Sequence, residues 1–139
     1  LIVDEPTSGL DPEERVRFRN LLADLAVRCT VILSTHIIED ISQSCNSMAV
    51  IHHGQVLFSG SPGELISNAN GKVWQITTDG RKPGSDIDIV STRQTQKGTE
   101  YRVLAESMEG FPSEFVNPSL EDGYLWLMHK ARGDHNVNE

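Results

Sequence analysis

The first twelve residues, LIVDEPTSGLDP, place two adjacent carboxylates directly after a short apolar run. An apolar run without polar alternation is typical of a parallel strand that is covered on both faces, so residues 1–3 predict such a strand. Because Asp4 and Glu5 are neighbours where the strand ends, their side chains point in different directions. A carboxylate pair beside buried residues costs desolvation free energy unless a cation or donors compensate it. The chain therefore begins with a predicted polar site at a strand end.

A helix and a second apolar run follow this site. Asp11 and Glu14 have the spacing of a capping box, with Pro12 between them at the first helical position. The predicted helix ends near Arg28 and has one apolar stripe, formed by Phe18, Leu21, Leu22 and Leu25. Residues 30–33 are again continuously apolar and run into Ser34, Thr35 and His36. Two parallel strands joined by a helix bring their carboxyl ends to one edge, where open α/β sheets bind ligands.

The next residues predict a short helix, a hairpin and another short helix. The first of these helices has Ile37, Ile38, Ile41 and Cys45 on one face. The segment SMAVIHHGQVLFSG predicts two strands around a turn at His53 and Gly54. Ser61 and Glu64 then repeat the capping pattern. These elements complete a first domain that we expect to span residues 1–67.

Gly, Asn and Pro become frequent after this point, so we place a boundary at residues 67–70 and expect a small α+β domain over 68–139. Residues 73–77 alternate as a half-buried strand, and residues 87–95 and 100–104 flank a turn with Gly98. A final helix after Pro118 carries Leu120, Tyr124, Leu127 and Met128 on one face, with Trp126 at its flank. From about residue 131 we expect a disordered tail. The predicted fold class is α/β, a parallel sheet with helices followed by this α+β domain.

Composition excludes several functions. The chain of 139 residues carries 12 basic and 20 acidic side chains, a formal net charge of -8, which repels nucleic acid and anionic lipids. No apolar run approaches the roughly 20 residues that a membrane helix needs, so we expect no direct membrane insertion. Cys29 and Cys45 lack the spacing of metal ligands and indicate a reducing compartment, with both side chains buried as small hydrophobes.

The polar residues of the strand ends suit phosphate chemistry. One carboxylate of the Asp4–Glu5 pair can hold Mg²⁺ through its water shell, while the other polarises an attacking water. His36 can donate to a γ-phosphate oxygen or orient the water. LIVDEPTSGLDP, followed after one helix and one strand by STHIIED, resembles the Walker B, D-loop and H-loop motifs of ABC-transporter ATPase subunits.

The resemblance implies a role for each matching residue. Asp4 would be the Walker B aspartate on the side of the metal, Glu5 the catalytic base, and His36 the switch histidine at the γ-phosphate. The D-loop, which crosses to a second ATPase subunit, would contain Ser8, Gly9 and Asp11. The implied ligands are ATP and Mg²⁺. GQVLFSGSPGEL and PSLEDGYLWLM resemble segments of subunits that pair with ABC-2-type export permeases, which implies a cytoplasmic protein held peripherally at the inner face of the membrane by its permease.

Three motifs of this family precede Walker B and do not occur in the sequence: the phosphate loop GxxxxGK(S/T), the Q-loop and the LSGGQ-type signature. We therefore expect the chain to be the C-terminal portion of an ATPase that couples ATP hydrolysis to export. We also expect the 139 residues alone to be inactive. The alternative is a non-catalytic regulatory, dimerisation or docking module.

Overall fold

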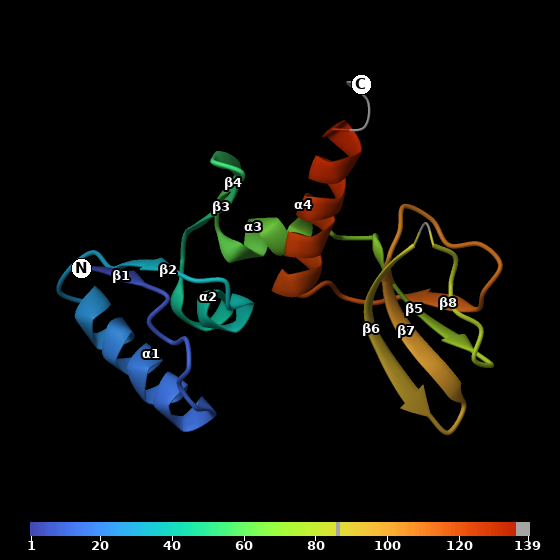
Figure 1. Ribbon diagram of the computed structural model, residues 1–139, viewed down its shortest axis with the longest axis horizontal. Helices are drawn as coiled ribbons and strands as arrows, with labels where there is room; N and C mark the ends of the chain where they lie inside the picture. The colour runs from blue at the N-terminus through green and yellow to red at the C-terminus, as the bar shows by residue number, and fades with distance from the viewer. Residues whose placement is uncertain (86, 136–139) are drawn as a thin grey trace.

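The first region consists of two short strands, each followed by a helix. In the computed structural model, which describes residues 1–85 and 87–135, these elements are β1 (Ile2–Asp4), α1 (Pro12–Ala26), β2 (Ile32–Ser34) and α2 (Ile38–Ser44). Strands β1 and β2 pair in parallel, with Asp4 opposite Ser34. Helix α1 lies along one side of the pair (Figure 1). The predicted strand–helix–strand unit is therefore confirmed.

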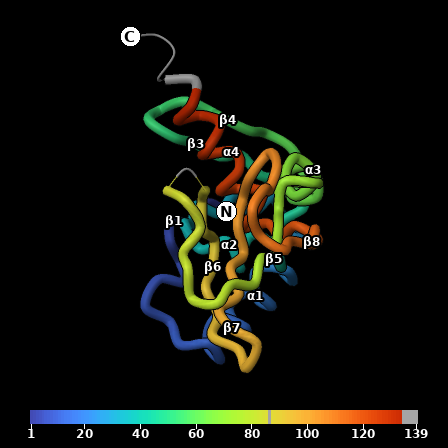
Figure 2. The backbone as a smooth tube through the Cα atoms, turned by 90° about the vertical axis from the view of Figure 1, so that its right-hand side faces the viewer, coloured from blue at the N-terminus to red at the C-terminus, as the bar shows by residue number. Residues whose placement is uncertain are grey.

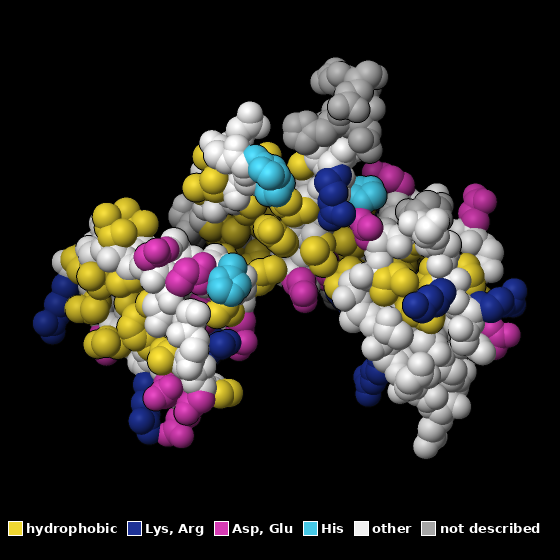
Figure 3. Space-filling view, in the orientation of Figure 1, with side chains coloured by type: hydrophobic (Ala, Val, Ile, Leu, Met, Phe, Trp, Pro, Cys, Tyr) yellow, Lys and Arg dark blue, Asp and Glu magenta, His cyan; other side chains and the backbone are white. Residues whose placement is uncertain are grey.

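The two strands are less buried than the sequence predicts. Ile2 is 78% exposed and its register partner Ile32 is 56% exposed. On α1, Leu22 is buried, but Leu21 of the predicted stripe is 53% exposed. Each strand has one neighbour within residues 1–85 and 87–135, and α1 covers one side only, so the expected burial on both faces is wrong here. Hydrophobic side chains accordingly gather on the surface of this lobe (Figure 3).

A hairpin and a short helix follow the first region as predicted. The hairpin pairs β3 (Met48–His52) with β4 (Gln55–Gly60) in antiparallel fashion. His53 and Gly54 at its turn both have positive φ, 47° and 74°, which a two-residue type I′ turn requires. Helix α3 (Pro62–Ser67) begins with the predicted capping box between Ser61 and Glu64.

A four-stranded antiparallel sheet follows α3. Its strands are β5 (Val73–Thr78), β6 (Asp88–Thr95), β7 (Gly98–Leu104) and β8 (Ser113–Phe115), in the order β6-β7-β5-β8. The predicted hairpin at Gly98 is the β6–β7 pair. Strand β8 was not predicted, because its three residues are all exposed and carry no apolar pattern. With these elements the α/β class is confirmed, and the parallel pair fits part of an ABC ATPase domain.

Helix α4 (Leu120–His135) connects the two regions (Figures 1 and 2). Its residues Leu120, Tyr124 and Leu127 pack with Val50 and Leu65 of β3 and α3. Trp126, which we expected at the flank, is 2% exposed and packs against Val73 and Leu104 of the sheet. One helix therefore contributes to the cores on both sides of residues 67–70, and the division into two domains there stays a prediction.

Two smaller expectations are wrong. Helix α4 continues to His135, so residues 131–135, which we expected to belong to a disordered tail, are helical. The rest of that expected tail, residues 136–139, lies outside the described residues. We expected both cysteines to be buried. Cys29 is exposed, because it lies beyond the end of α1, and Cys45 is half-buried. No helix within the described residues is long and apolar enough to cross a membrane.

The crossing of α4 over α3 depends on Gly123. A Cβ atom at this position would lie 2.4 Å from the carbonyl oxygen of Leu65, far inside van der Waals contact. Since that oxygen belongs to the backbone of α3, no side-chain rotation can relieve the clash. Glycine therefore allows the two helices to approach closely enough to bury Leu65 and Leu120.

We expect Gly123→Ala to lower the free energy of unfolding by about 1–3 kcal/mol, because the helices must separate. The matched control is Gly133→Ala on the same helix, where a Cβ meets no atom within 4 Å. That change is expected to stabilise α4 by up to about 1 kcal/mol through helix propensity. Urea denaturation gives the free energy of unfolding of both variants. Equal stability of Gly123→Ala and the parent chain would contradict the close crossing.

The start of α4 is held to the sheet by a buried ion pair. Asp122 is fully buried, and its Oδ2 accepts hydrogen bonds from Arg102 of β7 at 2.6 Å and from the Ser119 backbone at 2.6 Å. Burial alone raises the pKa of Asp122, but the donors from Arg102 and Ser119 outweigh it and hold the pKa below its usual value. The carboxylate thus caps α4 and neutralises Arg102 at the same time.

Asp122→Asn is expected to lower the free energy of unfolding at neutral pH by about 3 kcal/mol, because Arg102 loses its buried partner. Since the folded state lowers the pKa of Asp122, this stabilisation is present above the unfolded-state pKa of about 3.9 and is lost as the pH falls through the folded-state pKa. The difference in the free energy of unfolding between Asp122→Asn and the parent chain should therefore shrink below about pH 4. Asp79→Asn, which removes an exposed partner of Arg81, is the control and should leave the stability nearly unchanged.

Candidate functional site

The carboxyl ends of β1 and β2 bring the predicted site residues to one edge. Asp4 is the last residue of β1, and Ser34, its register partner, is the last residue of β2. The backbone N–H of Glu5 donates to the Ser34 carbonyl at 2.8 Å, which extends the pairing by one residue. Glu5 and His36 therefore leave the two strands side by side. The shared sheet edge that the sequence predicted is confirmed by this register.

Asp4 and Glu5 have different surroundings. Asp4 is exposed, and its carboxylate accepts a hydrogen bond from the hydroxyl of Ser34. Glu5 is half-buried and has φ 45°, a left-handed conformation that costs a non-glycine residue about 1–3 kcal/mol. Such backbone strain persists where the surrounding structure imposes it, and it is concentrated at functional sites. The turn at Glu5 directs its side chain away from that of Asp4.

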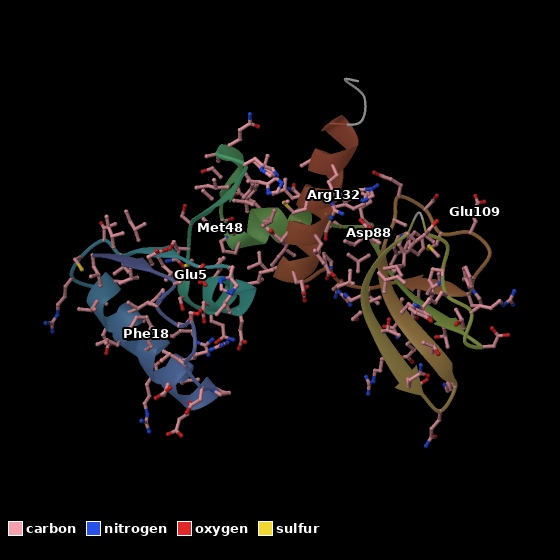
Figure 4. The ribbon with its side chains drawn as sticks, viewed as in Figure 1. Glu5, Phe18, Met48, Asp88, Glu109 and Arg132 are labelled. Carbon is pink, nitrogen blue, oxygen red and sulfur yellow. The ribbon has the colours of Figure 1, made fainter. Side chains whose placement is uncertain are left out.

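Glu5 lies against His36. Its Oε2 atom is 2.7 Å from Nδ1 of His36, whose side chain is 74% exposed, while that of Glu5 is 38% exposed. In Figure 4, Glu5 is labelled between α1 and α2. Oε2 itself is shielded from solvent, and no group within the described residues donates a well-aligned hydrogen bond to it, His36 included. A carboxylate that faces an imidazole at this distance is an arrangement that suits proton transfer from water.

The other predicted residues lie on the turn between β1 and α1. Ser8 and Gly9 are exposed, and Gly9 has φ 79°, which the turn requires and glycine adopts without strain. Asp11 caps α1: its Oδ1 accepts from the Glu14 N–H at 2.9 Å, and Glu14 Oε2 accepts from the Asp11 N–H at 3.1 Å. The structure thus brings Asp4, Glu5 and His36 together and leaves Ser8, Gly9 and Asp11 at the exposed start of α1.

Sequence reasoning missed two polar side chains behind this turn. Thr7 and Asp40 are each 1% exposed, and the Thr7 hydroxyl donates to the Asp40 carboxylate. Arg19 of α1 lies 3.5 Å from the other carboxylate oxygen. The available signal was weak, since Asp40 looks like a first-turn acidic residue of a short helix and Thr7 like one more polar turn residue.

The donors that the site offers fit a hydrated metal ion only in part. The described residues contain no group of three His, Cys, Asp or Glu side chains that could enclose a metal. Asp4 provides one exposed carboxylate beside the Ser34 hydroxyl. Mg²⁺ keeps several waters and is often bound through one or two carboxylates together with substrate phosphates. Asp4 therefore fits a metal that is held mainly by a bound phosphate compound.

The site also borders helix α4. A pocket of about 240 Å³ next to Thr35 and His36 is lined on its other sides by apolar residues of α2, β3, α3 and α4. Its far wall is formed by Leu120 and Tyr124, near the start of α4. The last helix of the chain therefore reaches the histidine of the candidate site.

Comparison with known proteins identifies the class. No family model matches the chain. It is 40% identical over 81 residues to the energy-coupling factor transporter ATP-binding protein EcfA2 of Clostridioides difficile, covering 57% of this chain and 28% of that protein. It is 40% identical over 72 residues to the Nod factor export ATP-binding protein I of Sinorhizobium fredii, covering 51% of this chain and 21% of that protein.

A third relative matches nearly the whole chain. An ABC transporter ATP-binding protein of Synechocystis is 36% identical over 138 residues, which cover 90% of this chain and 38% of that protein. The chain thus spans between about a fifth and two fifths of the length of these relatives. All three are ATP-binding proteins of transporters, and the resemblance to ABC transporter ATP-binding subunits that the motifs predict is confirmed.

The capping contact gives a test of the turn that carries Ser8 and Gly9. We expect Asp11→Ala to lower the free energy of unfolding by about 1 kcal/mol, because the first-turn N–H groups of α1 lose their acceptor. Asp11→Asn should lose much less unfolding free energy, since its side-chain oxygen can still accept the Glu14 N–H. Thermal unfolding followed by circular dichroism compares both with Asp24→Ala, an exposed site on the same helix. Equal losses for the alanine and asparagine variants would show that the charge of Asp11, and not its capping hydrogen bond, stabilises the helix.

Proposed function

We propose that this chain forms part of the ATP-hydrolysing site of an ABC transporter ATP-binding subunit. The observation that carries the proposal is the 2.7 Å approach of Glu5 Oε2 to His36 Nδ1 at the carboxyl edge of two parallel strands. A carboxylate next to an imidazole can take a proton from water while the imidazole orients that water. The names of the relatives support ATP as the ligand.

Each residue of the edge then has a distinct task. Glu5 is the general base that accepts the proton of the attacking water. His36, largely exposed, is free to donate to a γ-phosphate oxygen. Asp4 holds a hydrated Mg²⁺, whose charge offsets the charge that develops on the phosphate oxygens. The separation of Asp4 from Glu5 by the turn at φ 45° keeps the metal-side carboxylate apart from the base.

Other groups must complete this site. A nucleotide site of this kind needs a phosphate loop with its lysine, which the 139 residues do not contain. We propose that the rest of an ABC ATPase domain supplies it and pairs with β1 and β2. The exposed apolar side chains of Ile2 and Ile32 support this arrangement, since further strands and helices would bury them. The greater length of the relatives supports it as well.

The assembly that we propose follows the family resemblance. Two ATPase subunits face one another, and the exposed turn with Ser8, Gly9 and Asp11 contacts the second subunit. A membrane permease binds the pair and holds it at the cytoplasmic face of the membrane, and ATP hydrolysis drives export. The name of the Sinorhizobium fredii relative, which refers to export, supports the direction of transport.

A second candidate function is a non-catalytic regulatory or docking module. It is supported by the separate four-stranded sheet, which carries no predicted site residue. The two candidates differ in one measurable property: only the first requires hydrolysis that depends on Glu5.

In the complete subunit, we expect Glu5→Gln to lower kcat for ATP hydrolysis by at least about 100-fold, because amide nitrogen and oxygen cannot accept the proton. The KM for ATP should change little, since Glu5 is not expected to hold the nucleotide. A phosphate-release assay gives both values, and Glu13→Gln on the exposed face of α1 is the control. The 139-residue chain alone should show neither ATP binding by calorimetry nor turnover. Turnover that persists in Glu5→Gln would refute the assignment of the base.

A further inference from the structure

We propose that Asp40 is a positioning residue that ties the turn of residues 6–10 to helix α2, and so couples the position of Ser8 and Gly9 to that of His36. The proposal rests on the proposed function for its effect on hydrolysis. The tie, by which we mean the contact of Asp40 with Thr7, is observed within the described residues. Asp40 lies four residues after His36 and is the third residue of α2, and Thr7 directly precedes Ser8.

The contacts of Asp40 join three elements: the turn, α1 and α2. One carboxylate oxygen accepts the hydroxyl of Thr7 from the turn, and the other faces Arg19 of α1 at 3.5 Å. Thr7 and Asp40 are each 1% exposed, and the side chain of Arg19 is 12% exposed. Along α1, the one buried residue is Leu22. A polar contact, rather than a broad apolar interface, therefore holds the turn to α2.

The buried position of Asp40 argues against a role in stability alone. A buried carboxylate loses its hydration, and a pair of apolar side chains of similar volume often serves stability equally well. A hydroxyl-to-carboxylate bond, in contrast, is directional and short-ranged, so it fixes the relative position of the two segments. Glu5 lies two residues before Thr7, and His36 four residues before Asp40. A shift of α2 against the turn would thus alter the 2.7 Å Glu5–His36 approach and the exposed Ser8–Gly9 turn together.

The tie can be tested in the chain as it is, without ATP. Thr7→Val keeps the shape of the side chain and removes the donor, whereas Thr7→Ser keeps the donor. Hydrogen–deuterium exchange should accelerate about tenfold in Thr7→Val, both at the Leu10 N–H, which donates to Thr7, and over residues 36–40. Thr7→Ser should stay within about twofold of the parent chain. Acceleration confined to residues 7–10 would overturn the proposal, because the two segments would then move independently.

The control for general loss of stability is Asp122→Asn, which breaks the other buried carboxylate pair among residues 1–85 and 87–135. It should accelerate exchange around the start of α4 and leave residues 7–10 and 36–40 unchanged. If Asp122→Asn accelerates these two segments as strongly as Thr7→Val does, their response reflects global stability and the proposed tie is wrong.

The effect on hydrolysis is tested in the complete subunit. We expect Thr7→Val and Asp40→Leu, which remove the donor and the acceptor respectively, each to lower kcat about 10- to 100-fold with KM for ATP within about twofold, because misplacement by about 1 Å suffices for such a loss. Thr7→Ser should restore most of kcat, and Asp122→Asn should retain it. Unchanged kcat in Thr7→Val, in a subunit whose hydrolysis depends on Glu5, would overturn the positioning role and leave the proposed function standing. A subunit without Glu5-dependent hydrolysis would refute the proposed function, and the exchange experiment would still decide the tie.

Discussion

The parallel register of β1 and β2 determines where every group of the candidate site lies. With Asp4 opposite Ser34, the chain leaves both strands at the same edge, and the next residues bring Glu5 within 2.7 Å of His36. A slip by one residue would turn alternate side chains to the other face of the pair, and it would separate these groups. The backbone bond from Glu5 to the Ser34 carbonyl extends the register beyond the strands and sustains the left-handed turn at Glu5.

Four carboxylates in and near the candidate site and helix α4 have surroundings of two kinds. Asp40 and Asp122 are buried, and each faces an arginine and a neighbouring donor, so their charges are compensated within the fold. Asp4 and Glu5 lie at the sheet edge without an arginine or lysine partner among the described residues. Compensated carboxylates position elements, whereas uncompensated ones remain available to a cation or a proton. This contrast supports assigning chemistry to the sheet edge and positioning to the buried pairs.

Helix α4 makes the sheet of β5–β8 and the site part of one packed structure. Its close crossing over α3 at Gly123 places Leu120 and Tyr124 beside the pocket that borders His36, while Trp126 packs on the sheet.

The sequence by itself determined the local elements and most of the site. Signals within a few residues predict the capping boxes at Asp11 and Ser61, the turn at His53 and Gly54, and the β6–β7 hairpin. The rule for parallel strands predicts that Asp4, Glu5 and His36 lie at one sheet edge. Only the tertiary structure decided the exposure of Ile2 and Ile32, the burial of Asp40 against Thr7, and the contact of Gly123 with Leu65. These features depend on which distant segments meet, and burial is a property of the neighbours that a side chain finds rather than of its own chemistry.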